Sequence, residues 1–189
     1  MLYFINELPL ISLSTVQWTI ENVISLISVF LVGVGGVLAL LQWRSASKVK
    51  RAEFVNQIIE KLRFDQDMVN AMGMVDYGTI RYDESFHNGT DGKEAQIDKL
   101  LSYLSIVCFL RTLHVIQKDE FAFFEYYLYR VYSSGSLCGY LWNLYHFAKK
   151  RNIRCPFHFL IKYGVKNKMI DWENFKDPNS NIYNKTLNF

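Results

Sequence analysis

The longest uncharged stretch of the sequence, Val23 to Leu41, constrains the fold more than any other feature. Its nineteen residues include no charged side chain, no proline and no side-chain amide. An α-helix rises about 1.5 Å per residue, so this stretch would be about 28 Å long as a helix, close to the ~30 Å hydrocarbon core of a bilayer. We therefore predict a single membrane-spanning helix within residues 18–43.

The residues on either side of this stretch predict its boundaries and its orientation. Trp18 precedes it and Trp43 follows it, and indole rings prefer the headgroup level of a bilayer. No lysine or arginine precedes Arg44. Because basic residues resist translocation, we expect residues 1–17 to form an external, interfacial segment and residues 44–189 to lie in the cytoplasm.

Two other interpretations of the stretch are less consistent with its neighbours. A cleaved signal peptide would have basic residues before a shorter apolar core and a small-residue cleavage site after it. Here Glu7 is the only charged residue before Trp18, and the small cluster Ser45-Ala46-Ser47 follows Arg44. A buried core helix of a soluble domain is disfavoured because apolar runs of about 18 residues or more are typical of spans.

One side of the predicted span carries small or polar residues. In lipid, helices associate through close packing of small side chains and through hydrogen bonds, because the solvent itself is apolar. Gly35 and Ala39 form a small-xxx-small pair, so we expect copies of the chain to self-associate here. The alternative is that the span merely tolerates small residues. The small-residue seam consists of Ser25, Ser28, Val32, Gly35 and Ala39.

The remainder of the chain is predicted to be helical. Residues 44–189 hold 21 basic and 16 acidic residues, a net charge of +5, and the whole chain has only three prolines. The predicted fold class is all-α: one N-terminal transmembrane helix, then a cytoplasmic bundle of about five helices in residues 44–170. Residues 171–189 are predicted to be a polar tail. Three scattered cysteines suit a reducing compartment.

Apolar periodicity locates the individual helices. We expect the span to continue as a helix through residues 45–65, and a loop with a short strand pair around Ile80 and Tyr82. The other helices are expected over residues 65–78, 93–116, 121–132, 137–150 and 156–163. Residues expected to face the core of the first two are Met68, Val69, Met72 and Val75, and Ile97, Leu100, Leu101, Leu104, Val107, Cys108 and Val115.

Arg111 falls on the apolar face of the predicted helix 93–116, with His114 beside it. A guanidinium in such a position must be paired or must face a cavity. An ion pair with Asp76, Glu120 or Glu125 would give Arg111 a structural role. The alternative is that Arg111, helped by His114, binds an anion.

Residues 126–170 contain no acidic residue, although they hold eight basic and eleven aromatic residues. Basic residues at a helix end can simply complement the helix dipole. Two functional alternatives are contact with anionic lipid headgroups, at about 1 kcal/mol per basic residue, and binding of a nucleotide by stacking and phosphate contacts. The candidate ligand-binding residues are Arg130, Lys149, Lys150, Arg151 and Arg154, besides Arg111 and His114. The aromatic residues include Tyr132, Tyr140, Trp142, Tyr145, Phe157 and Tyr163.

The sequence contains no motif that supports catalysis or cofactor binding. It has no G-x-S-x-G, no glycine-rich phosphate loop and no His-x-x-x-His pair. Cys155 and His158 have the spacing of half a zinc site, but a structural zinc site needs four ligands. His146 and Cys138 would have to complete the set. We therefore expect no metal, no cofactor, no catalytic residues and no enzyme activity.

The uncharged span, the basic residues directly after it, and a helical region containing DKLLSYLSIVCFLRTLHV and FAFFEYYLYRVY resemble a group of small bacterial proteins. These proteins have one span in the inner membrane and a cytoplasmic helical domain of unknown function. Some proteins of similar layout act in anti-phage defence, where the cytoplasmic domain senses a signal or partner and the spans perturb the membrane. The likeness is one of layout over most of the chain.

The resemblance implies a homo-oligomer in the bacterial inner membrane whose helical domain is the sensor. The expected function is that of a non-enzymatic sensor, effector or assembly subunit that binds a cytoplasmic protein partner or an anionic nucleotide. The alternatives are a simple membrane adaptor and a nucleotide-binding module.

Overall fold

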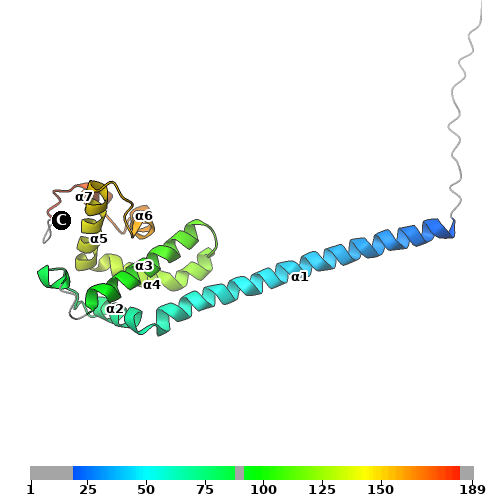
Figure 1. Cartoon of the computed structure of the whole chain (residues 1–189), viewed down its shortest axis with the longest axis horizontal. Coiled ribbons are helices and arrows are strands. Elements are labelled where there is room, and N and C mark those ends of the chain that lie inside the picture. The colour runs from blue at the N-terminus through cyan, green and yellow to red at the C-terminus, as the bar shows by residue number, and fades with distance from the viewer. Residues whose placement is uncertain (1–18, 88–91, 184–189) are drawn as a thin grey trace, which may run out of the picture. The chain divides into compact units, whose positions relative to one another are not determined.

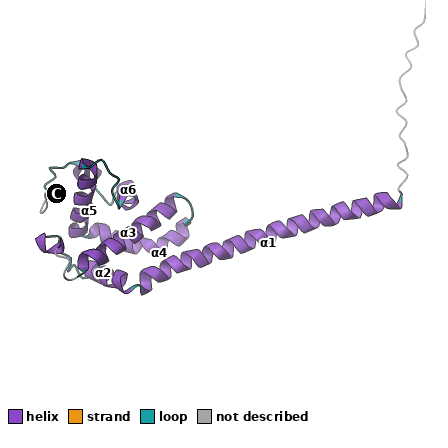
Figure 2. Ribbon diagram, viewed as in Figure 1, coloured by secondary structure: helices purple, strands orange, loops and turns teal. Residues whose placement is uncertain are grey.

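The computed structural model describes residues 19–87 and 92–183, and within these ranges every regular element is helical (Figure 2). The all-α prediction is thus confirmed, whereas the expected strands around Ile80 and Tyr82 are not formed in the described part of the chain. Two compact units meet between Arg51 and Ala52, and each is described by itself. The predicted interfacial segment 1–17 and Trp18 lie outside the described residues.

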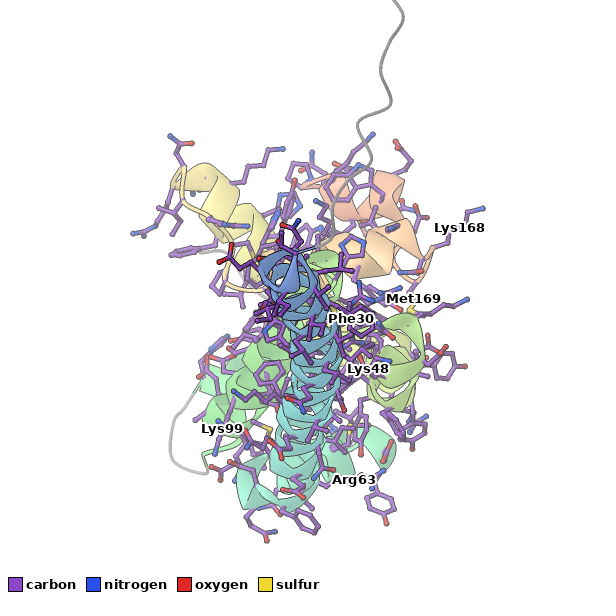
Figure 3. All side chains as sticks on the ribbon, turned by 90° about the vertical axis from the view of Figure 1, so that its right-hand side faces the viewer. Phe30, Lys48, Arg63, Lys99, Lys168 and Met169 are labelled. Atoms are coloured by element: carbon purple, nitrogen blue, oxygen red, sulfur yellow. The ribbon has the colours of Figure 1, made fainter. Side chains whose placement is uncertain are left out.

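A single continuous helix, α1 (Ile20–Phe64), contains the uncharged stretch (Figure 1). It is long and apolar enough to cross a membrane, and none of its most apolar window is buried. Phe30, for instance, is 69% exposed (Figure 3). The Ser28 hydroxyl donates to the Ile24 carbonyl at 2.8 Å, so it is satisfied within its own helix. As predicted, the helix continues without a break beyond the uncharged stretch.

The second unit is built around one central helix, α3. This helix contacts α2, η1, α4 and α6, while α5 packs on α4 (Figure 1). The elements after α1 are α2 (Gln66–Asp76), the 3₁₀ helix η1 (Glu84–His87), α3 (Lys93–Thr112), α4 (Lys118–Ser133), α5 (Gly135–Lys150), α6 (His158–Lys166) and α7 (Trp172–Lys176).

Polar side chains determine where several of these helices begin. The Asp65 carboxylate accepts hydrogen bonds from the backbone N–H groups of Asp67 and Met68, which have no partner within the helix. Ser134 ends α4 and accepts a bond from the N–H of Leu137 at 3.4 Å, so that α5 begins almost at once. These short connections limit how far neighbouring helices can separate.

The core confirms most of the predicted buried face of α3. Its residues Ile97, Leu100, Leu101, Leu104 and Val107 are fully buried. Val115 is 36% exposed, contrary to the prediction, because α3 ends at Thr112, and Ile116 is buried in the following loop instead. Val69 was likewise predicted to face the core, but it is 42% exposed, and Ala71 of α2 is buried.

The segment after Asp171 contributes to this core as far as it is described. Phe175 in α7 is fully buried and lies against Tyr145 of α5, with ring centroids 5.5 Å apart. The His146 Nε2 donates to the Phe175 carbonyl at 3.0 Å, and Trp142 Nε1 donates to the Asp177 carbonyl at 3.3 Å. The sequence-based interpretation of a polar tail missed this packing, since one buried phenylalanine among polar residues gives no periodic signal.

Candidate anion-binding site

A groove of about 490 Å³ lies between the C-terminal end of α3, the start of α4 and α6. We call it the basic groove. Its lining combines an aromatic wall with five basic side chains, against one acidic residue, Glu125. The aromatic wall consists of Phe121, Phe159 and Tyr163, and the basic residues are Arg111, His114, Lys118, Lys162 and Lys166.

Arg111 lies in the last turn of α3, where its Nη1 donates to the carbonyl of Ile116 at 3.2 Å. Among the described residues, none of the three anticipated partners, Asp76, Glu120 and Glu125, forms an ion pair with Arg111 within 4.0 Å, although Glu125 lines the same groove. Asp76 is bound by Arg130, and Glu120 accepts a bond from the N–H of Gln117 at the start of α4. Arg111 therefore supports the α3–α4 loop and at the same time lines the basic groove.

His114 reaches the groove because of how α3 ends. Its φ of 58° places it in the left-handed region, and the N–H of Val115 bonds back to the Leu110 carbonyl at 3.0 Å. This is the Schellman arrangement, in which glycine is the usual residue at the left-handed position. Asn152 and Lys168 end α5 and α6 with the same left-handed backbone, so this helix ending is a recurrent feature of the unit, and here it places His114 at the groove.

The lysines of the groove are free of close ion pairs. Lys162 and Lys166 are four residues apart, so they share one face of α6, and Lys118 opens α4. No carboxylate of the described residues lies within 4.0 Å of these three ammonium groups. The pKa of nearby His158 is lowered mainly by burial and further by the positive charges of Arg154 and Lys162.

Arg130 does not belong to this groove. Its Nε donates to the Asp76 carboxylate at 2.7 Å, and its Nη2 donates to the Asp76 backbone carbonyl at 2.7 Å. The Tyr126 hydroxyl donates to the same carboxylate at 3.1 Å. Arg130 thus connects α4 to the end of α2, and its predicted role in anion binding has no counterpart in the lining of the basic groove.

The cluster at the end of α5 also lies apart from the groove. Lys149, Lys150 and Arg151 are exposed, and the Arg151 guanidinium lies over the Phe147 ring at 4.6 Å. Arg154 is different, because it lies 4.7 Å from the centroid of the Phe159 ring, which lines the groove. Of the predicted residues, the structure therefore brings together Arg111 and His114, with Arg154 at the edge.

The aromatic residues of 126–170 serve mainly as core. A stacking surface for bases requires exposed rings, but Tyr132, Tyr140, Trp142 and Phe157 are each at most 8% exposed. These four rings therefore cannot form part of an exposed surface on which bases stack. Of the six aromatic residues named from the sequence, Tyr163 lines the basic groove.

The cysteines are unsuited to nucleophilic chemistry. All three are buried, and burial raises the pKa of Cys108 to about 12 and that of Cys138 to about 11. A thiol that remains protonated at neutral pH is a poor nucleophile. Within residues 19–87 and 92–183, no group of three or more His, Cys, Asp or Glu side chains is arranged to hold a metal ion.

A second polar cluster joins η1, α3 and α5. The Tyr140 hydroxyl donates to the Asp98 carboxylate at 2.7 Å, and His87 Nδ1 lies 2.7 Å from Glu94 Oε1. Burial raises the pKa of Asp98, and the charge of Glu94 raises it further, while the Tyr140 hydrogen bond opposes both. The ionised Asp98 carboxylate therefore destabilises the folded state at neutral pH.

Replacing Asp98 by asparagine is expected to raise the melting temperature at about pH 7, and to lose this effect at about pH 3, where the unfolded aspartate is also protonated. Because the pKa of Asp98 is raised in the folded state, the wild-type protein loses stability as the pH rises through the range in which Asp98 ionises. Asparagine does not ionise, so the variant does not lose this stability. Melting curves of the full chain at both pH values measure the difference.

Asp65→Asn serves as the opposite control for this prediction. The hydrogen bond from Lys99 lowers the pKa of Asp65, so the wild-type carboxylate stabilises the fold at neutral pH and ceases to do so as the pH falls through its folded pKa. Asparagine preserves the helix cap, so the variant is expected to be less stable near pH 7. Equal pH profiles for both variants would contradict the assignment.

Sequence reasoning missed three of the five basic groove residues. Lys162 and Lys166 belong to the stretch without acidic residues, and their spacing of four was a usable signal of a shared helix face. Lys118 gave no signal, because it precedes that stretch and only tertiary packing brings it near α6.

Comparison with known proteins adds no assignment at this point. No protein-family model, curated protein or solved structure matches the chain. The function must therefore be argued from the helices and the groove themselves.

Proposed function

We propose that this protein is a membrane-anchored, non-enzymatic sensor, effector or assembly subunit. In this proposal α1 crosses a bacterial inner membrane once, residues 1–17 lie outside, and the helical unit lies in the cytoplasm. The carrying observation is that the apolar window of α1 is entirely unburied. Leaving apolar surface in water costs about 25 cal/mol per Å². A helix with this much uncovered apolar surface is therefore more stable inside a bilayer than in water.

The membrane position is tested by extraction of the full chain from isolated membranes. A spanning helix is released by detergent but stays in the pellet in alkaline carbonate or strong salt. Release by salt alone would show a peripheral attachment, and would remove the basis of the proposal.

The small-residue seam supports assembly through the span. Its five members are exposed along α1, and a Cβ added at Gly35 would meet nothing within 4 Å. This face is therefore open for close approach of a second copy. The layout shared with anti-phage membrane proteins supports a role in which ligand or partner binding by the helical unit changes how the spans pack.

Gly35→Leu is expected to shift the protein from oligomer to monomer while leaving it in the membrane. A leucine at this position holds two helix backbones apart and removes the close contacts that drive association in lipid. Size measurement in mild detergent, together with proximity cross-linking in membranes, reports the change.

Gly33→Leu is the matched control for this substitution. Gly33 is two residues away and faces the other side of α1, and a Cβ there also meets nothing within 4 Å. It adds the same side chain to the same helix, so it is expected to leave the oligomer intact. If Gly35→Leu leaves the oligomer unchanged, or both variants dissociate equally, assembly through the seam is wrong.

The alternative function is that of an adaptor whose span is only an anchor. The observation that favours it is the compact unit Ala52–Phe189, which has its own core. Replacement of residues 20–43 by an unrelated apolar span distinguishes the two: an unchanged oligomer would assign assembly to the helical unit and favour the adaptor.

A further inference from the structure

We propose that the basic groove binds the phosphates of a nucleotide. This inference rests on the second unit alone and would stand even if the span only anchored the chain. The volume of about 490 Å³ falls within the range of about 300–1,000 Å³ that small-molecule sites occupy.

The charge of the groove indicates an anionic ligand. Lys118, Lys162 and Lys166 come from two helices and line one hollow, and no carboxylate of the described residues lies within 4.0 Å of their ammonium groups. Like charges gathered in this way repel one another. A bound phosphate removes the repulsion and accepts charge-assisted hydrogen bonds from several of these donors.

The remaining lining indicates that the ligand is more than phosphate. Phe159 and Tyr163 are half-buried rings of the aromatic wall and are partly open to the groove, whereas Phe121 is only 2% exposed and supports them from below. Phe159 packs against Phe109 with ring centroids 4.4 Å apart and planes tilted by 38°, and Phe121 contacts Tyr163 at 5.2 Å. Bases pack on such rings regardless of their identity. Glu125 lines the same groove and repels pure polyanions, whereas it accepts hydrogen bonds from ribose hydroxyls or base amino groups.

Titration of the full chain with ATP in an uncharged detergent tests this proposal. ATP is a sufficient probe, because lysine–phosphate contacts are the same for every base. The double variant Lys162→Gln/Lys166→Gln is expected to weaken ATP binding by about tenfold or more. Both side chains are exposed, so their replacement does not endanger the fold.

The matched control is Lys149→Gln/Lys150→Gln. It removes the same two positive charges from an exposed helix end outside the groove, and at about 0.15 M salt it is expected to change the affinity less than about twofold, because distant exposed charges are screened. Absence of ATP binding, or equal loss in both double variants, would overturn the proposal.

Two further probes separate the nucleotide from other phosphates. Inorganic tripolyphosphate should bind more weakly than ATP, because it lacks the base and ribose that face the aromatic wall and Glu125. A short-chain phosphatidylglycerol should bind more weakly still. If phosphatidylglycerol binds more tightly than ATP and loses binding in the groove variant, the groove is a lipid-headgroup site and the nucleotide proposal is wrong.

Discussion

Replacing Phe175 by alanine is expected to lower the free energy of unfolding by about 3–5 kcal/mol, the range for removal of a buried aromatic ring. The ring is fully buried, although it belongs to the short helix α7 in a polar segment. It contacts Tyr145 of α5 and Tyr183, with ring centroids 5.5 Å apart in each case. Alanine would leave a cavity between α5 and the C-terminal segment.

Chemical unfolding of the full chain, followed by tryptophan fluorescence, measures this loss. Trp142 and Trp172 flank the site, so they report on α7, while Trp18 and Trp43 add a background that is the same in both variants. Ile182→Ala is the control, because Ile182 is 59% exposed and its truncation is expected to change stability by less than about 0.5 kcal/mol. Similar stability of both variants would mean that α7 does not dock on α5.

Replacing Gly164 by alanine is expected to destabilise the protein by about 1–3 kcal/mol, the usual cost of overpacking. A Cβ there would lie 2.7 Å from Cε1 of Tyr132 and 2.8 Å from Cδ1 of Ile170. The Tyr132 ring is held in place because its hydroxyl donates to the Leu160 carbonyl at 2.7 Å. The clash therefore outweighs the helix propensity that alanine adds, about 1 kcal/mol.

Gly139→Ala in α5 provides the comparison for this steric argument. Its nearest contact would be Cδ1 of Tyr82 at 3.5 Å, an ordinary van der Waals distance. The substitution is expected to be neutral or stabilising by up to about 1 kcal/mol, because only the helix propensity changes. Thermal unfolding of both variants measures the two changes in stability. A Gly164→Ala protein as stable as the wild type would show that Tyr132 and Ile170 can move aside.

Gly164 also has a consequence for the basic groove. The absence of a side chain lets α6 approach Tyr132 of α4 closely, and this approach positions Lys162 and Lys166, which lie on either side of Gly164 in the same helix. The groove thus depends on core packing as well as on its own lining.

The sequence alone determined the features that arise from nearby residues. An uncharged run of nineteen residues already specifies a long apolar helix, since length and composition need no partner. The buried face of α3, from Ile97 to Val107, followed from spacing along one helix. The break at Ser134 and the caps are likewise local, because the hydrogen bonds join residues two or three positions apart.

Only the tertiary structure decided which charges meet. Arg130 and Asp76 are 54 positions apart. Nothing in the sequence shows that Asp76 would form its ion pair with Arg130 and that Arg111 would instead line a groove. The basic groove joins the ends of three helices, so neither Lys118 nor Glu125 could be assigned to it beforehand. Burial of Phe175 against α5 has the same physical origin: helices form through short-range contacts, whereas a site between them depends on how distant helices pack.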